Sequence, residues 1–295
     1  MKTHLNGIEF TVDSDFLPEY WKAVADGKWE PHTFDVLDYY VNKAMVVMDV
    51  GCWAGPLSLY MAAKGTKVHA LDPDPEAFQS LEKNILFNPS LDGQIVAHNI
   101  ALGIRSGEHP LFARKGYGHS SSSLLHRIRD RIFTAKADVL TINEFIKSAQ
   151  IAKLDFIKID IEGGEFELSE HITHVVEKLE HPTILLSLHY SHLNESIYQS
   201  KGFSKRAALT LMKIEKFFDA YWNMNELLCG SVQINQLASK YKYLYTSAGQ
   251  LVSKKTLARN FYQDEFFQLV FTNVEWIEPI SSTDRFVNRH KSTSA

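Results

Sequence analysis

The chain has 295 residues, of which 45% are hydrophobic, so it is long enough for one or two domains with a buried core. Its 31 basic and 35 acidic residues give a formal net charge of −4, and no block of like charges marks a polyanion-binding arm, so we expect no nucleic-acid partner. Its two cysteines imply neither a disulfide framework nor a zinc site, and they fit a reducing compartment.

The first hundred residues alternate strands and helices. Residues 45–50 form a short apolar run that ends at a glycine, which predicts a buried strand followed by a tight turn. The elements expected after it are a helix at 57–63, a strand at 67–72, a helix from 74 to about 87 and a strand at 94–102. Such alternation predicts an α/β fold with a doubly wound, mostly parallel sheet.

The alternation breaks after residue 103 and then resumes. Residues 107–113 predict a hairpin strand, and residues 115–123 form a polar loop of the kind that often carries function. The later elements expected are helices at 141–146, 166–179 and 205–222, and strands at 154–161, 183–189, 241–245 and 267–271. The last two strands would form an antiparallel C-terminal hairpin and complete a seven-stranded sheet.

These elements favour one main domain. We expect an N-terminal extension (1–44) packed on a catalytic domain (45–280) with an insertion at about 104–137, and a frayed tail at 281–295. The N-terminus lacks the apolar core of an export signal, and no apolar stretch approaches the about 18 residues of a membrane span. The expected location is therefore cytoplasmic.

The turn after the first strand, residues 49–55 with the sequence DVGCWAG, is the first candidate binding loop. Gly51 and Gly55 allow the backbone to approach a ligand closely, with a helix N-terminus just beyond. Dinucleotide folds normally carry a third glycine between such a pair, where the backbone meets a pyrophosphate. The bulkier loop here, from Asp49 to Gly55 and including Trp53, suits a cofactor without phosphates.

Polar residues end the second and third predicted strands. Asp72 stands where a carboxylate can accept hydrogen bonds from both hydroxyls of a ribose. Asn99 is placed to reach an adenine, although an asparagine that only forms a turn explains it nearly as well. The plainer alternative for the whole set is that the glycines turn the chain and Asp72 caps a helix.

Two carboxylates end the strand at 154–161. Because side chains alternate along a strand, Lys158, Asp160 and Glu162 should face the same side, at the open edge of the sheet where ligands bind in this fold. A carboxylate there can act as a general base that removes the proton of a substrate hydroxyl. The alternative is that Glu162 and Glu165 cap the next helix.

His189 ends the following strand and should emerge at the same edge. It is a candidate general base, or a ligand that joins Asp160 and Glu162 around a divalent cation such as magnesium. A buried histidine bonded to the backbone is the rival interpretation. In the polar loop, His119 and Ser121 are candidate substrate contacts.

These motifs together resemble the FkbM family of S-adenosylmethionine-dependent methyltransferases, which have the class I methyltransferase, Rossmann-like fold. The resemblance covers about residues 30–190, and its most specific part is DFIKIDIEGGE at 155–165, with MDVGCWAGP at 48–56, ALDPDP at 70–75 and NIALG at 99–103. It implies S-adenosyl-L-methionine as cofactor, Ala101 as a further cofactor contact, and O-methylation of a sugar or another natural-product hydroxyl.

The chain departs from the usual family pattern at two positions. Trp53 stands where asparagine is common, and Asp72 stands where glutamate is frequent. The segment at 29–34 resembles the lead-in of some relatives and adds Glu30 and Thr33 as cofactor-side candidates. The resemblance does not extend beyond residue 190. We therefore expect the acceptor to be recognised by the helix at 205–222 and the strands at 241–245 and 267–271.

The sequence thus predicts an O-methyltransferase acting on a hydroxyl of a sugar or glycan, with Asp160, Glu162 or His189 as base or metal ligands. Other acceptors remain open: another small-molecule hydroxyl, a protein or a nucleic acid. Methylation of nucleic-acid amino groups would require a Pro-Pro dipeptide where this chain has Ile161 and Glu162. A dinucleotide oxidoreductase and a non-catalytic Rossmann-like module are the least favoured alternatives. The oligomeric state is not readable from the sequence.

Overall fold

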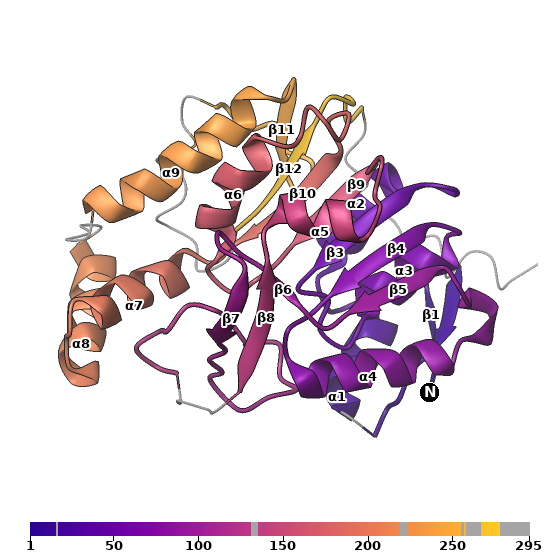
Figure 1. Ribbon diagram of the computed structural model, residues 1–295, viewed down its shortest axis with the longest axis horizontal. Helices are drawn as coiled ribbons and strands as arrows, with labels where there is room; N and C mark the ends of the chain where they lie inside the picture. The colour runs from indigo at the N-terminus through magenta and orange to yellow at the C-terminus, as the bar shows by residue number, and fades with distance from the viewer. Residues whose placement is uncertain (16, 131–134, 219–223, 255–256, 258–266, 278–295) are drawn as a thin grey trace, which may run out of the picture.

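A computed structural model describes residues 1–15, 17–130, 135–218, 224–254, 257 and 267–277 (Figure 1). Its main sheet has seven strands in the order β11-β12-β10-β9-β3-β4-β5. The strands β3 (Val46–Val50), β4 (Lys67–Leu71), β5 (Ile95–His98), β9 (Phe156–Ile159) and β10 (Thr183–Leu188) are parallel. The pair β11 (Tyr243–Thr246) and β12 (Phe267–Thr272) is antiparallel. The predicted fold class is confirmed, including the C-terminal hairpin.

Helices cover both faces of the sheet because the side chains of each buried strand alternate between two cores. Val47 and Phe156 face one core, while their neighbours Met48 and Ile157 face the other. The first core is closed by helices α1 (Pro18–Ala25), α2 (Pro31–Tyr40), α3 (Pro56–Ala63) and α4 (Pro75–Leu86). The second is closed by α5 (Ile142–Ser148), α6 (Glu165–Thr173) and α9 (Met224–Ser239) (Figure 1).

Local sequence signals set the starts of two helices. Asp74 accepts hydrogen bonds from the backbone of Glu76 and Ala77 at the start of α4, and a proline follows it at the first helical position. Thr141 and Glu144 form a reciprocal capping box at the start of α5. Both helices were predicted at these places.

The third predicted strand, residues 94–102, is wrong as a single element. It divides into β5 and a separate β6 (Ala101–Leu102), which pairs with β8 (Lys136–Leu140) in a three-stranded sheet completed by β7 (Gly107–Pro110). The chain leaves the main sheet at Asn99, whose side chain donates to the backbone oxygen of Asp72. The apolar run at 94–102 therefore begins in the main sheet and ends in the three-stranded sheet.

The helix predicted at 166–179 is too long, since α6 ends at Thr173. Val176 and Leu179 in the turns that follow stay buried in the same core, so the apolar pattern outlasts the helix. The helix predicted at 205–222 is α8 (Lys205–Phe218), and residues 219–222 lie outside the described part of the chain, as does the tail at 281–295. The hairpin of β1 (Lys2–Leu5) and β2 (Ile8–Thr11), and helix α7 (Tyr190–Ser200), were not predicted.

The N-terminal residues 1–44 pack on the rest of the chain through the core that they share with α3 and α4. Residues 104–130 contain β7 and the polar loop and lie beside the carboxyl edge of the main sheet (Figure 1). Within the described residues, no helix is both long and apolar enough to cross a membrane.

Candidate active site

A cavity of about 390 Å³ lies at the carboxyl edge of the parallel strands, where ligands bind in doubly wound sheets. Four parts of the chain line it: the loop after β3, the ends of the neighbouring strands, the N-terminal extension and the inserted segment. Of the predicted site residues, Glu30, Gly51, Trp53, Asp72, Ala101, His119, Asp160, Glu162 and His189 line this cavity. The structure does not bring Thr33, Asp49, Gly55, Asn99 or Ser121 to its wall.

The glycine loop is pressed against the end of β9. Gly51 has φ +76°, and a Cβ atom on it would lie 1.8 Å from the backbone oxygen of Asp160. Only glycine fits such a position. Beneath the loop, the buried Asp49 accepts a hydrogen bond from Ser58 Oγ at 2.6 Å and lies 3.6 Å from Lys158 Nζ. Asp49 thus stabilises the start of the loop through its contacts with Ser58 and Lys158, without lining the cavity.

Asp72 sits at the end of β4 with its carboxylate buried in the cavity wall. One oxygen accepts from the backbone of Trp53 at 2.8 Å and the other from the backbone of Asp74 at 2.9 Å. Burial raises the pKa of Asp72 to about 7, although both of these hydrogen bonds oppose the shift. A ligand that donates to this carboxylate would stabilise its ionised form.

Trp53 connects the glycine loop to the inserted segment. Its indole Nε1 donates to the backbone oxygen of Gly118 at 2.7 Å. The backbone nitrogen of Gly118 donates in turn to the carboxylate of Asp74, which also accepts from Ser122. The polar loop at 115–123 is therefore fastened over the ends of β3 and β4, and His119 in it faces the cavity.

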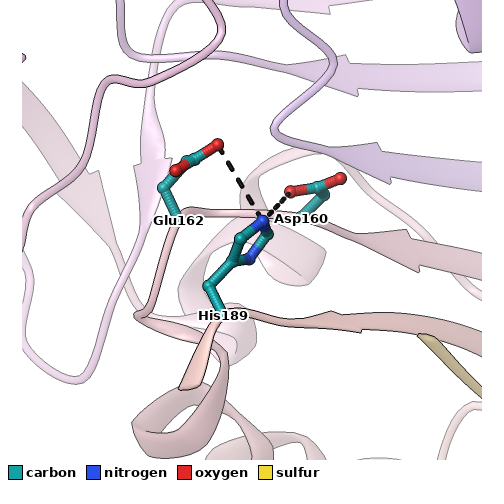
Figure 2. Close-up of side chains that lie close together, drawn as sticks. All are labelled: Asp160, Glu162 and His189. Atoms are coloured by element: carbon teal, nitrogen blue, oxygen red, sulfur yellow. Dashed lines mark ion pairs between the residues drawn. The ribbon is translucent and has the colours of Figure 1, made fainter. Parts of the chain in front are cut away.

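Asp160, Glu162 and His189 converge on one side of the cavity (Figure 2). His189 Nε2 lies 3.6 Å from Asp160 Oδ1 and 3.9 Å from Glu162 Oε1. Burial disfavours a charged imidazole, but the carboxylates of Glu165, Asp160 and Glu162 outweigh it and raise the pKa of His189 to about 10. Without a bound metal, this histidine is an imidazolium at neutral pH.

Glu165 orients His189 from behind. Its fully buried carboxylate accepts from His189 Nδ1 at 2.9 Å and from the backbone of Ile161 and Gly163. Nε2 is thereby left to face Asp160 and Glu162. The sequence alone assigned Glu165 only as a possible helix cap. It does bond the backbone at the start of α6, and its bond to the histidine depends on how β10 ends beside that helix.

Glu162 is held by cations that the sequence analysis did not single out. Its Oε2 lies 3.2 Å from Arg127 Nη1 and 2.9 Å from His192 Nδ1. Burial alone would raise the pKa of Glu162, but His192, His189 and Arg127 lower it to about 2. Arg127 is itself buried and forms a close ion pair with Asp130 at 3.0 Å. Nothing in the local sequence marked Arg127, because it reaches the site through the inserted segment.

The buried Lys158 lies between the carboxylates of Asp49 and Asp160. Its Nζ donates to the backbone oxygen of Gly51 at 3.0 Å and lies 3.7 Å from Asp160 Oδ2. Burial disfavours its charge, but Asp160 and Asp49 keep its pKa above the ordinary lysine value. A buried ammonium thus fixes the glycine loop and Asp160 relative to each other.

The N-terminal extension closes the cavity with Tyr20, Trp29 and Glu30. Burial, with Asp160 next in importance, raises the pKa of Glu30. Its Oε2 accepts from Thr33 Oγ1 at 2.9 Å, so Thr33 positions Glu30 rather than facing the cavity. Tyr20 was not predicted as a site residue, because one turn of a short helix gave no pattern that pointed to a ligand. Trp29 belongs to the segment at 29–34 that resembles the lead-in of some relatives, but only Glu30 and Thr33 of that segment were predicted as site residues.

The trio also meets the geometric requirement of a metal site. Asp160, Glu162 and His189 each offer one ligand atom, and these atoms lie within 4.8 Å of one another. The carboxylate behind the imidazole is typical of metal-binding histidines. Two carboxylates with one imidazole suit manganese, iron or zinc better than magnesium, which prefers oxygen ligands alone.

Comparison with known proteins agrees with this arrangement. Residues 47–169, which include the glycine loop, Asp72, Asp160 and Glu162, match the family model of the methyltransferase FkbM domain. This part of the chain is therefore similar to the methyltransferase FkbM domain. No curated protein matches the sequence.

Several solved structures are similar in fold. Methyltransferase FkbM from Methylobacillus flagellatus KT is 17% identical with a TM-score of 0.37, covering 64% of this chain and 48% of that one, so the chain spans about half the length of that protein. A TehB-like SAM-dependent methyltransferase from Corynebacterium glutamicum is 10% identical, with a TM-score of 0.40 and coverage of 88% and 96%. A putative O-methyltransferase from Klebsiella pneumoniae is 13% identical, with a TM-score of 0.39 and coverage of 83% and 81%. Similarity at this level carries no argument about the acceptor.

Proposed function

We propose that this chain, with its FkbM-type methyltransferase domain, transfers the methyl group of S-adenosylmethionine to a hydroxyl oxygen of a sugar or glycan. The observation that carries the proposal is a single cavity with Asp72 at one side and the cluster of Asp160, Glu162 and His189 at the other. The first can hold a ribose and the second can receive a proton. Several carboxylates around the cavity also favour a cofactor whose reacting sulfur is positively charged.

The cofactor half of the site would lie over β3, β4 and β5. Asp72 has hydrogen-bond capacity left on both oxygens after its two backbone contacts, and ribose hydroxyls can donate to it. Ala101, beyond the end of β5, would border the adenine. This orientation directs the sulfonium toward β9 and β10, where the catalytic cluster stands.

In the proposed reaction the acceptor oxygen attacks the methyl carbon, the carbon–sulfur bond breaks, and S-adenosylhomocysteine leaves with the bonding electrons. The proton of the acceptor hydroxyl passes to a base. Glu162, with a pKa of about 2, is a weak base, and His189 with a pKa of about 10 already carries its proton. Asp160 is left as the base, and the imidazolium of His189, 3.6 Å away, would hold its carboxylate in place.

A metal ion is the second mechanism that the cluster supports. If the ligand atoms of Asp160, Glu162 and His189 hold a divalent cation, the ion supplies a Lewis acid that lowers the pKa of the acceptor hydroxyl. Metal analysis of the purified protein and activity before and after a chelator separate the two mechanisms. Full activity of a metal-free preparation would exclude this one.

The acceptor half of the site favours a polyhydroxyl ligand. Hydroxyl-bearing Ser120, Ser122 and Ser123, together with His119, border the cavity beside the catalytic cluster. Such side chains can both donate to and accept from sugar hydroxyls. Another small-molecule hydroxyl or a protein side chain remains an alternative acceptor, and the net charge of −4 disfavours a nucleic acid.

The test begins with calorimetry of S-adenosylmethionine and S-adenosylhomocysteine, because absence of binding would refute the proposed function. Methyl transfer is then assayed on a panel of deoxysugar glycosides. We expect Asp160→Asn to lower the rate by about 10²–10⁴-fold and to keep S-adenosylhomocysteine binding. Asp138→Asn, which neutralises an exposed carboxylate on β8, is the matched control and should leave the rate unchanged.

A further inference from the structure

Tyr20 places a buried hydroxyl in the cavity wall with no hydrogen-bond partner among the described residues. Buried tyrosine hydroxyls are normally paired, since an unpaired donor keeps its desolvation penalty. The ring packs edge-on against Trp53 at 4.3 Å and Trp29 at 5.1 Å between centroids. These contacts hold the ring in place, so the hydroxyl is a fixed donor without an acceptor.

Glu30 is the complementary group nearby. No described cation forms an ion pair with it, and its carboxylate interacts electrostatically with both Tyr20 and Asp160. Its backbone has φ +41°, an unusual conformation for a residue other than glycine, at the point where α2 begins. Thr33 holds one of its oxygens. The carboxylate is therefore fixed beside the cavity with no cation of the described residues at ion-pair distance, since Lys158 and His189 act on it only from farther away.

The strand order indicates which part of a cofactor would meet these two residues. A nucleoside over Asp72 and Ala101 occupies the ends of β4 and β5. The rest of the molecule must then extend across β3 toward β9. Tyr20 and Glu30 both line the cavity, and Asp160 at the end of β9 acts electrostatically on each of them, which places the two on the β9 side of the glycine loop.

We propose that Tyr20 and Glu30 bind the amino-acid end of the cofactor. The Tyr20 hydroxyl donates a hydrogen bond to its α-carboxylate, and Glu30 accepts from its α-ammonium. One fixed donor and one unpaired carboxylate match the two charges of a free amino acid, and the nearby ammonium of Lys158 offsets the negative charge of the ligand. This inference rests on the proposed function, which supplies the cofactor, and it adds two contacts from outside the segment at 47–169.

Tyr20→Phe tests the inference, because it removes only the hydroxyl. Calorimetry would compare S-adenosylhomocysteine with 5′-methylthioadenosine, which has the same nucleoside and no amino-acid end. We expect the affinity for S-adenosylhomocysteine to fall about tenfold or more and that for methylthioadenosine to stay unchanged. The melting temperature should stay unchanged or rise, since an unpaired buried donor disappears. Glu30→Gln should show the same difference between the two ligands.

Tyr241→Phe is the matched control, because the Tyr241 hydroxyl donates to the backbone oxygen of Pro182 at 2.8 Å. It should lower the melting temperature and leave both affinities unchanged. The inference is overturned if Tyr20→Phe leaves S-adenosylhomocysteine binding intact or weakens both ligands equally. An effect limited to the KM of the acceptor would also overturn it, by assigning the hydroxyl to the acceptor. If the wild-type protein binds neither ligand, the proposed function fails first.

Discussion

Gly51→Ala is the substitution whose consequence follows most directly from the structure. The new Cβ would lie 1.8 Å from the backbone oxygen and 2.9 Å from the backbone carbon of Asp160. Neither segment can yield easily, since Gly51 donates to Leu71 O at 2.9 Å and Asp160 donates to Val50 O at 3.0 Å. Relief requires the end of β9 to move by roughly 1 Å, and displacements of that size can lower a catalytic rate about 10²-fold.

Gly93→Ala separates the clash from backbone strain. Gly93 has φ +71°, close to the +76° of Gly51, and a Cβ atom there would meet nothing within 4 Å. Both variants should lose about 1–2 kcal/mol from the left-handed conformation alone. The clash should add about 1–3 kcal/mol in Gly51→Ala only.

The assays are urea unfolding of both variants and calorimetry of S-adenosylhomocysteine. We expect Gly93→Ala to bind normally and Gly51→Ala to bind weakly or not at all. Equal losses of unfolding free energy, with normal binding in both variants, would refute the close contact between the glycine loop and Asp160.

Three further predictions concern the same site. Arg127→Met should lower the free energy of unfolding by about 3–5 kcal/mol in urea, because it removes a buried guanidinium that pairs with both Asp130 and Glu162; a loss under about 1 kcal/mol would contradict the buried ion pairs. Since burial raises the pKa of Asp72 to about 7 and ribose hydroxyls bind its ionised form, the affinity for S-adenosylhomocysteine should rise about tenfold from about pH 6 to about pH 8. The Asp72→Asn variant should lack that rise, and an identical profile in it would assign the pH dependence elsewhere. Trp53→Phe removes the indole hydrogen bond to the polar loop, so limited proteolysis within residues 115–123 should become faster, whereas an unchanged cleavage rate would show that other contacts hold the loop.

Patterns in the sequence were sufficient for the parallel sheet and for one edge of the site. Continuous apolar runs identify buried strands, and parallel strands end at the same edge, so the sequence alone assigns Asp72, Asp160 and His189 to one edge of the sheet. The three indeed line it together. The prediction of one strand at 94–102 was wrong. An apolar run in the sequence does not reveal that Ala101 and Leu102 pair with β8, while Ile95–His98 pair with β4.

Only the tertiary structure could decide what surrounds that edge. Three contacts at this edge join segments that are far apart in the sequence: Glu165 with His189, Arg127 with Glu162, and Tyr20 with Trp53 of the glycine loop. Their roles depend on which side chains meet across elements, and periodicity within one element carries no information about such meetings. The sequence by itself thus determined the sheet and the positions of its terminal acids. The partners and pKa values of these acids were decided by how the N-terminal extension and the inserted segment pack against the sheet edge. A partner and a pKa value depend on burial and on charges that only folding brings together.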